Sequence, residues 1–348
     1  MQKVASFIFI LVLCGCKSLA PDSYKNYLSD EPWKNIRLAD SNEVPVVSDS
    51  MVIIRTNRAF LPGKAKFLAD YIDHSGTART FLIIAKNGRW MVHSIPDINT
   101  GMEISGKRQN IVVYVEGMGK NFFLATERAL QMSSQYGVSV VMMDYPSINP
   151  LYGMNRNFRS SKENAYQTAP YLVHLLKEID ADKKAGREWT KVKRTLFMHS
   201  MGNIMLRKIL MDRSDTAISH GLFNLIILNA ACTDEKGHNL WIDNSKLGNN
   251  FVINYNKYDK QLNGAQMLLF KRQLGTKPQK PLAKKAFYID FHQLVGSRHS
   301  NFVNIRFRAP VHTHASNYYT FILNGTFPDL NNTKLLLPAR KGIGYYLK

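Results

Sequence analysis

Short apolar runs alternate with longer segments of mixed polarity along most of the chain after residue 50. Such runs are typical of strands buried on both faces of a parallel sheet, and apolar residues at helical spacing indicate the helices between them. We expect strands at 51–55, 80–85, 90–94, 111–115, 138–143, 195–198, 225–228, 251–255 and 286–289. We expect helices at 122–136, 161–179, 203–211 and 318–323. The alternation predicts an α/β fold with a mostly parallel central sheet and helices on both faces.

The expected helix at 161–179 has a clear sequence signal at its start. Ser160 followed three residues later by Glu163 fits a capping box. Apolar residues then fall on one helical face: Ala165, Ala169, Leu172, Val173, Leu176 and Ile179. Pro170 inside this pattern predicts a kink, because proline cannot donate the helical hydrogen bond.

The first sixteen residues predict export. A basic start at Lys3 precedes an apolar run at 4–13 that is typical of a signal peptide and too short to span a bilayer. The following Leu13-Cys-Gly-Cys16 resembles a bacterial lipobox, with cleavage before Cys16 and acylation of that residue. The alternative is an ordinary signal peptide cleaved nearby. The sequence therefore predicts a lipid-anchored protein of the bacterial cell envelope, held at the membrane through its N-terminal lipid.

The remaining chain is long enough for one large domain. We expect a signal peptide at 1–15, a polar tether and approach segment at 16–48, a folded α/β domain at 49–326 and a basic C-terminal tail at 327–348. The 348 residues are 45% hydrophobic, which is enough for a sizeable core.

The charge and the cysteine content of the chain limit which binding partners, disulfides and metal sites are expected. The formal net charge is +20, which favours attraction to anionic lipid headgroups or anionic envelope polymers, although a solvated basic surface is the simpler alternative. Nucleic acid is not an expected partner, because no nucleic-acid motif is present. After loss of Cys14 and acylation of Cys16, Cys232 stands alone, so the mature chain has no intramolecular disulfide. No Cys/His cluster has zinc spacing, and neither a metal nor a cofactor is expected.

The segment 194–203 carries the strongest chemical signal. An apolar strand leads into His199-Ser-Met-Gly202 and then a helix, which predicts that Ser200 lies on a sharp strand-to-helix turn with its hydroxyl exposed. The amide of Met201 and the positive end of the helix would face the group that Ser200 attacks. This geometry suits acyl transfer with Ser200 as the nucleophile.

A serine nucleophile needs a base, and the base needs an acid to orient it. In α/β-hydrolases the acid and then the histidine follow the serine along the chain. Asp259, just after the strand at 251–255, is the favoured acid, and Asp234 is its rival. The candidate bases are His292, His299, His312 and His314. We choose His314 narrowly over His312, because this pair lies on the loop before the helix at 318–323, where the base is expected.

A glycine-rich loop is expected to supply the second backbone donor of an oxyanion hole, in addition to the Met201 amide. The strand at 111–115 runs into Glu116-Gly-Met-Gly119, and the glycines allow a close approach to the substrate. The expected amide donors are Met118 and Met201. An ordinary tight turn is the alternative, whereas a dinucleotide site is disfavoured because the third glycine of that fingerprint is missing.

These motifs together resemble the bacterial esterase/lipase branch of the α/β-hydrolases. His199-Ser-Met-Gly-Asn203 matches the nucleophile motif of that branch, and weaker matches occur at 144–147, 228–231 and 255–259. The resemblance spans about 110–325 and implies hydrolysis of carboxylic esters or thioesters without metal or cofactor. Two residues depart from the pattern: Glu116 replaces a histidine, and Met198 replaces a small residue. The alternative is therefore a catalytically silent lipoprotein that binds an envelope ligand in the same pocket.

Overall fold

A computed structural model describes residues 29–348 except 49, 306–308, 328, 331–334 and 340–342. The predicted signal peptide at 1–15 and the predicted acylation site Cys16 lie outside the described residues. Among the helices that the structure describes, none combines the length and the apolar character needed to cross a membrane.

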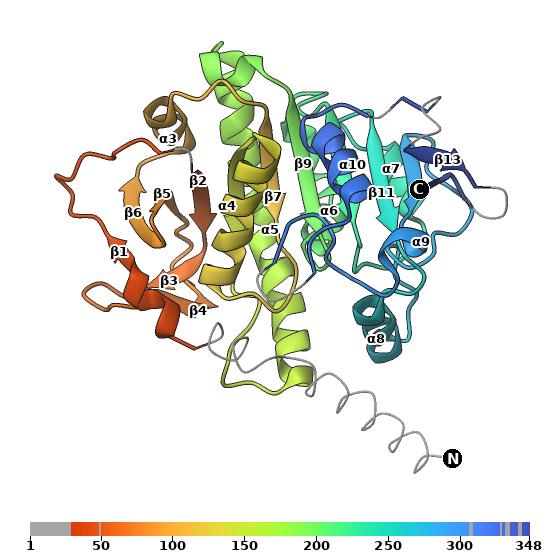
Figure 1. The fold of residues 1–348 in the computed structure, drawn as a ribbon, viewed down its shortest axis with the longest axis horizontal. Coiled ribbons are helices and arrows are strands. Elements are labelled where there is room, and N and C mark those ends of the chain that lie inside the picture. Colours follow the sequence, from red (N-terminus) through yellow and green to blue (C-terminus); the bar gives the residue numbers. More distant parts are fainter. Residues whose placement is uncertain (1–28, 49, 306–308, 328, 331–334, 340–342) are drawn as a thin grey trace.

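One twisted sheet runs through the molecule (Figure 1). Within the described residues it contains twelve strands in the order β1-β6-β5-β2-β8-β7-β9-β10-β11-β12-β14-β13. In this sheet order, each strand from β2 to β14 pairs in parallel with the next. β5 is antiparallel to both β2 and β6, and β13 is antiparallel to β14. The strands are β1 Ile36–Leu38, β2 Met51–Thr56, β5 Arg79–Lys86, β6 Arg89–Ile95, β7 Ile111–Val115, β8 Ser139–Asp144, β9 Arg194–His199, β10 Leu225–Asn229, β11 Phe251–Tyr255, β12 Ala286–Asp290, β13 Leu336–Pro338 and β14 Tyr345–Leu347. The predicted mostly parallel sheet is confirmed.

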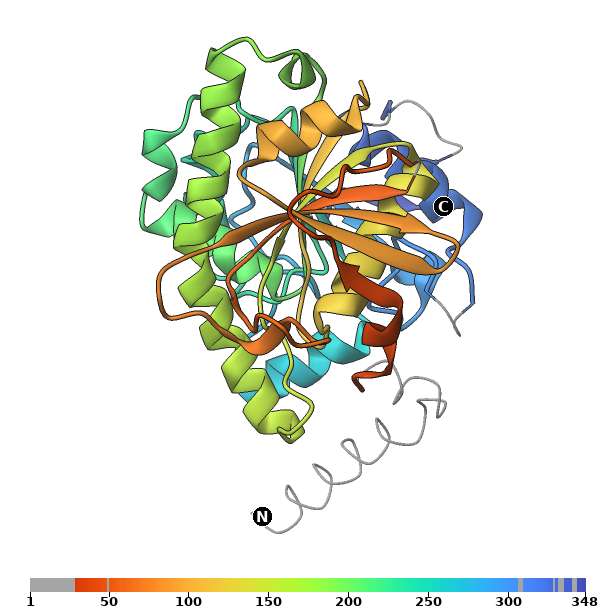
Figure 2. The same ribbon diagram turned by 90° about the vertical axis from the view of Figure 1, so that its left-hand side faces the viewer.

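Helices cover both faces of this sheet (Figure 2). Alternate strand residues point to opposite faces, so Val113 and Val115 of β7 join the cluster of α3, α5, α6 and α7, whereas Val112 and Tyr114 join that of α4, α9 and α10. The helices are η1 Glu31–Asn35, α3 Ile98–Ser105, α4 Phe122–Tyr136, α5 Met154–Lys184, η2 Glu188–Lys191, α6 Gly202–Met211, η3 Ser214–Ala217, α7 His238–Asp243, α8 Lys260–Leu269, α9 His292–Val295 and α10 Thr313–Leu323. Strands buried on both faces explain the continuous apolar runs of the sequence.

The folded domain extends beyond the expected bounds of 49–326 at both ends. β1 lies in the expected tether and pairs with β6, while β13 and β14 lie in the expected tail and extend the sheet beyond β12. A further small hairpin of β3 Arg58–Phe60 and β4 Leu68–Ile72 follows β2. β1, β13 and β14 have three residues each, which is too short to show a periodic signal, and β1 and β14 pair with strands that are distant in sequence.

The helix expected at 161–179 begins earlier than its capping signal predicts. α5 starts at Met154 and continues through Pro170 to Lys184. The Ser160 capping box is therefore wrong, because Ser160 lies inside the helix. Asn157 in the first turns holds the preceding loop: its amide donates to the carbonyl oxygens of Asn149 and Tyr152.

The carboxyl ends of the parallel strands bring the candidate residues to one edge of the sheet. The turn after β7 carries Glu116, the turn after β9 carries Ser200, and the turn after β11 carries Asp259. Ligands of open α/β sheets bind outside this edge. We refer to it below as the carboxyl edge.

Candidate active site

Ser200 lies on the strand-to-helix turn that the sequence predicts. Its φ of 51° is in the left-handed region, and its backbone N–H donates to the backbone carbonyl oxygen of Asn229 at 3.0 Å. Such a conformation is strained for a residue with a side chain, and strained residues cluster at functional sites. Gly202 makes the turn possible, because a Cβ at this position would lie 2.8 Å from the Val115 carbonyl oxygen.

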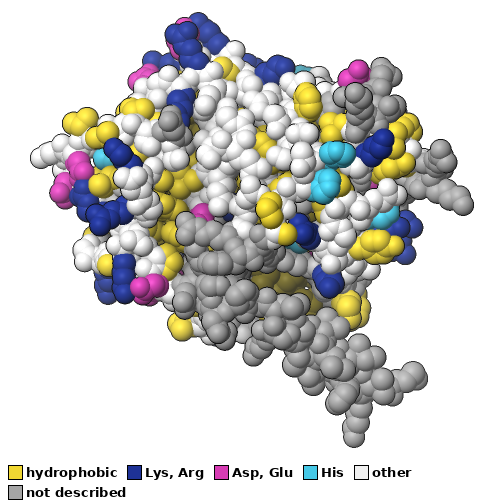
Figure 3. Space-filling model, in the orientation of Figure 1, with side chains coloured by type: hydrophobic (Ala, Val, Ile, Leu, Met, Phe, Trp, Pro, Cys, Tyr) yellow, Lys and Arg dark blue, Asp and Glu magenta, His cyan; other side chains and the backbone are white. Residues whose placement is uncertain are grey.

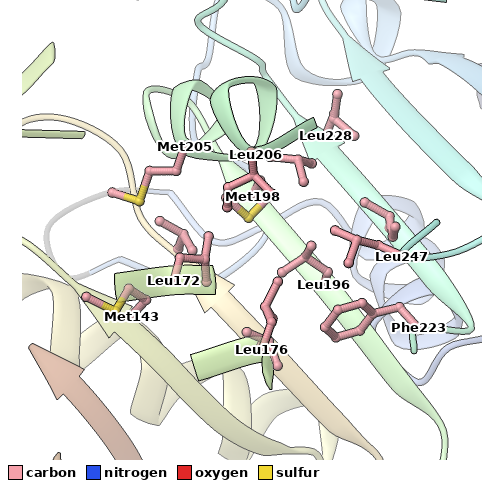
Figure 4. Packing of buried hydrophobic residues seen from close by; sticks show 14 of the residues in the cluster. Met143, Leu172, Leu176, Leu196, Met198, Met205, Leu206, Phe223, Leu228 and Leu247 are labelled. Carbon is pink, nitrogen blue, oxygen red and sulfur yellow. The ribbon is translucent and has the colours of Figure 1, made fainter. Parts of the chain in front are cut away.

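Met198 does not disturb this turn. Its side chain is fully buried between β9 and the helices above it, where it packs near Leu172 of α5 and Leu206 of α6 (Figure 4). Methionine is unbranched and flexible, so it fills this space without separating α6 from the sheet. The backbone oxygen of Met198 accepts a hydrogen bond from the Asn203 amide at 3.0 Å, which ties α6 to the end of β9.

Asp259 pairs with His299. The Asp259 Oδ2 atom lies 2.6 Å from Nδ1 of His299, and both side chains are buried. Asp259 also caps α8, because its Oδ1 accepts the backbone N–H groups of Gln261 and Leu262, each at 3.0 Å. The carboxylate accepts a hydrogen bond from Nδ1–H of His299, which leaves Nε2 as the unprotonated ring nitrogen.

The loop that carries His299 is fixed beside the nucleophile turn. The rings of His299 and His199, the residue before Ser200, lie with their centroids 4.9 Å apart. The next residue, Ser300, places its Oγ 3.3 Å from Nε2 of His199. The side-chain amide of Asn256 also holds this loop, because it donates to the Gly296 carbonyl oxygen at 2.8 Å. The Asp259–His299 pair therefore lies beside His199, the residue that precedes Ser200, on the carboxyl edge.

His314 and His312 lie elsewhere. His314 is in the first turn of α10, where Nδ1 lies 2.6 Å from the Lys348 carbonyl oxygen. His312 caps the same helix by accepting the His314 backbone N–H. The expected pairing of His314 with Asp259 is therefore wrong, because the loop after β12 delivers His299 to the acid before the chain reaches α10.

The rejected candidates also find other partners. His292 pairs with Asp290 at 2.8 Å, and Asp234 lies 3.6 Å from the ammonium of Lys271. The sequence did place His299 among the four late histidines on the required side of Asp259. Nothing in the sequence ranked it first, because the reach of the loop depends on the path of the folded chain.

The Glu116 carboxylate lies in a buried hydrogen-bond network beside the loop 116–119, which carries the expected oxyanion donor Met118. The carboxylate accepts hydrogen bonds from the Tyr114 hydroxyl at 2.5 Å, the Gly117 backbone N–H at 2.7 Å and the Arg128 guanidinium at 2.8 Å. Burial by itself would raise the pKa of Glu116, but the charge of Arg128 holds this pKa well below its usual range. Glu116 is therefore a fixed anion that orients the loop, a role that does not need the histidine of the related motif.

The two expected oxyanion donors are open. Within the described part of the chain, the backbone N–H groups of Met118 and Met201 donate to no protein acceptor, whereas the Gly119 N–H is used by the Ser147 oxygen at 3.0 Å. Gly117 brings the loop against Ser200: a Cβ built on Gly117 would lie 2.9 Å from the Ser200 Oγ. Free N–H groups beside a nucleophile are the arrangement that stabilises an oxyanion.

His199 is held as a neutral imidazole. Its Nδ1 lies 3.1 Å from the side-chain nitrogen of Asn229, whose oxygen already accepts from Asn254 and Tyr319. Nδ1 is therefore the acceptor, and the proton is on Nε2, 3.6 Å from a Glu116 oxygen. Burial lowers the pKa of His199 well below its usual range, with Glu116 acting in the opposite direction.

The burial of neutral histidines such as His199 predicts that the free energy of unfolding decreases in mild acid. Burial also lowers the pKa values of His238 and His93. In the unfolded chain these rings bind protons below pH about 6.5, whereas the folded chain excludes them, so the free energy of unfolding falls as pH decreases. The slope is expected to reach at most about 1.4 kcal/mol per pH unit for each such histidine.

Urea unfolding at pH 5.5, 6.2 and 7.0 measures this slope. The conservative variant His199→Gln is expected to flatten it, because one of the excluded protons is removed. A free energy of unfolding that is constant or increases toward pH 5.5 would contradict this account of the buried histidines.

A separate cavity of about 400 Å³ lies along the loop that contains His299. Arg298, Ser300 and His312 are among its lining residues, but Ser200 is not. We therefore do not assign the acyl substrate to this cavity. In the part of the chain that the structure describes, no group of three or more His, Cys, Asp or Glu side chains is placed to hold a metal ion.

Comparison with known proteins agrees with the fold. A family model described as "Alpha/beta hydrolase of unknown function (DUF900)" matches residues 97–297. This match covers the turns that carry Glu116, Ser200 and Asp259, and it ends just before His299. No curated protein and no solved structure matches the chain. The α/β-hydrolase fold expected from the sequence is confirmed by the family match and by the parallel sheet.

Proposed function

Since this chain belongs to the family of alpha/beta hydrolases of unknown function (DUF900), we propose that it is a serine hydrolase that cleaves carboxylic esters through an acyl-enzyme. The single observation that carries the proposal is the 2.6 Å contact between Asp259 and His299 beside a serine with φ of 51°. A buried carboxylate on Nδ1 of a histidine, next to a strained serine turn, is the arrangement that activates a serine hydroxyl.

In the proposed reaction, Ser200 Oγ attacks the ester carbonyl carbon while His299 Nε2 takes the hydroxyl proton. Asp259 stabilises the resulting imidazolium through Nδ1, and the N–H groups of Met118 and Met201 bind the oxyanion. The C–O bond to the leaving alcohol then breaks, and His299 returns its proton to that alcohol. Water, deprotonated by the same nitrogen, hydrolyses the acyl-enzyme and regenerates Ser200.

Labelling with a fluorophosphonate probe tests the nucleophile, because the probe forms a covalent bond with an activated serine. We expect the full chain to be labelled and Ser200→Ala to lose all labelling. Ser297→Ala removes an exposed hydroxyl from the loop of His299 and is the matched control that keeps its label. A folded wild-type chain that does not react would contradict the proposal and favour the silent, ligand-binding alternative.

The untested expectations about location accompany this proposal. Acylation of Cys16 would anchor the enzyme in the bacterial envelope, where the esters of lipids and other envelope molecules are available. Mass spectrometry of the mature N-terminus tests this anchor independently of any activity.

A further inference from the structure

Phe270 is the most unusual exposed side chain of the described structure. It ends α8 with a φ of 52°, in the left-handed region, and 94% of its surface is exposed. Bulky residues are rare in this conformation, and the position is normally occupied by glycine or asparagine. An aromatic ring here strains the helix end and gains no burial within the domain, which indicates a use outside it.

Other exposed apolar and cationic side chains surround Phe270. Tyr258 and Met267 are 54% and 46% exposed, which is unusual for such large apolar groups. We define the α8 surface by six of the exposed residues in this segment, which are Lys257, Tyr258, Lys260, Met267, Phe270 and Lys271. Lys271 lies 3.6 Å from Asp234, and His292, whose ring packs on Tyr258, lies 2.8 Å from Asp290, so acidic groups border this surface on two sides.

The charge of this region is strongly positive. Residues 256–285 contain eight Lys and Arg residues, and their acidic residue is Asp259, which is fully buried beneath His299. Dark blue cationic and yellow apolar side chains lie interspersed at the lower right of Figure 3, where α8 lies in Figure 1. Aromatic and apolar groups among lysines are the composition of surfaces that rest in the headgroup region of anionic membranes.

The beginning of the described chain lies at the same edge of the molecule. Trp33 in η1 stacks on Phe122, the first residue of α4, with ring centroids 5.7 Å apart. α4 begins at the carboxyl edge, as α8 does, so η1 lies on this side of the domain. Ser29, the first described residue, follows the predicted acylation site Cys16 by thirteen residues, and a chain of that length reaches at most about 45 Å. A lipid on Cys16 would hold this edge, rather than the opposite one, near the bilayer.

We propose that the α8 surface binds an anionic lipid bilayer and turns the carboxyl edge of the sheet toward it. The lysines contact lipid phosphates, and the side chains of Phe270, Met267 and Tyr258 enter the interfacial region. This orientation is independent of catalysis. If the proposed hydrolase activity is also present, the orientation presents Ser200 to amphiphilic esters of the membrane.

The test measures sedimentation with vesicles, using the full chain with Cys16→Ser so that this residue cannot be acylated. Wild type is expected to sediment with phosphatidylglycerol/phosphatidylcholine vesicles far better than with phosphatidylcholine alone, and less in high salt. The triple variant Lys257→Gln, Lys260→Gln and Lys271→Gln is expected to weaken this binding at least about tenfold. Its matched control carries Arg108→Gln, Lys191→Gln and Lys193→Gln at the opposite edge, and retains binding.

The variant Phe270→Asn separates a bilayer from an anionic polymer. Asparagine tolerates the left-handed conformation, so the fold is expected to be as stable as wild type or more stable, which urea unfolding checks. Vesicle binding is expected to fall about tenfold, whereas Met211→Asn, an exposed apolar residue that ends α6, leaves it unchanged. Full vesicle binding by Phe270→Asn, with loss of both vesicle and heparin binding in the lysine variant, would overturn the proposal in favour of a polyanion site. Equal binding by the lysine variant and its control would also overturn it.

Discussion

Replacement of His299 by alanine is expected to reduce kcat/KM for p-nitrophenyl esters by about 10⁴-fold or more, because removal of the base leaves only oxyanion stabilisation and binding. His299 is the histidine that contacts Asp259 directly, at 2.6 Å. The equivalent change His314→Ala is expected to leave activity unchanged, since His314 contacts the Lys348 carbonyl oxygen. The pair of variants therefore decides which histidine is the base.

Loss of folding must be separated from loss of the base. His299→Ala removes one hydrogen-bond partner of the buried Asp259 carboxylate, which keeps the backbone N–H groups of Gln261 and Leu262, so a loss of about 1–3 kcal/mol of stability is expected. His299→Gln retains a side-chain donor that can reach Asp259 but has no basic nitrogen. We expect this variant to unfold at nearly the wild-type urea concentration and to be as inactive as His299→Ala. Substantial activity in either variant would refute the assignment.

Gly117→Ala is expected to reduce kcat by about 10²–10³-fold, the cost of losing one oxyanion donor. The added Cβ would lie 2.4 Å from the Ser200 Cβ and 2.9 Å from its Oγ, so either the serine or the loop with Met118 must move. The backbone around Ser200 cannot relax easily, because Gly202 already lies close to the Val115 carbonyl oxygen.

Gly264→Ala is the matched control for this substitution. It makes the same chemical change in α8, at a position where a new Cβ meets no atom within 4 Å. Alanine favours a helix, so stability is expected to rise by up to about 1 kcal/mol with unchanged activity. A fluorophosphonate rate that is the same in Gly117→Ala and wild type would contradict the position of this loop against the nucleophile.

The sequence by itself determined the sheet and the nucleophile turn. Strands buried on both faces must be apolar throughout, so their runs predicted every strand from β5 to β12 within one residue. Ser200 was found because the strand, the turn and the helix that position it are consecutive in the chain. Asp259 was chosen as the candidate acid because it lies just after the strand at 251–255, and the structure shows its carboxylate in contact with His299.

The tertiary structure decided the features that depend on contacts between different segments of the folded chain. The choice among four late histidines rests on the path of the loop between β12 and α10, which local periodicity does not specify. The effect of Glu116 depends on Arg128, which lies in the following helix α4 and folds back onto the carboxylate, and the effect of Met198 depends on the space between α5 and α6. β1 and β14 join the sheet through partners distant in sequence and β13 pairs with β14, so their own short runs gave no signal. Local patterns are set by burial and backbone preference, whereas the partner of each polar group is set by which segments the completed fold brings together.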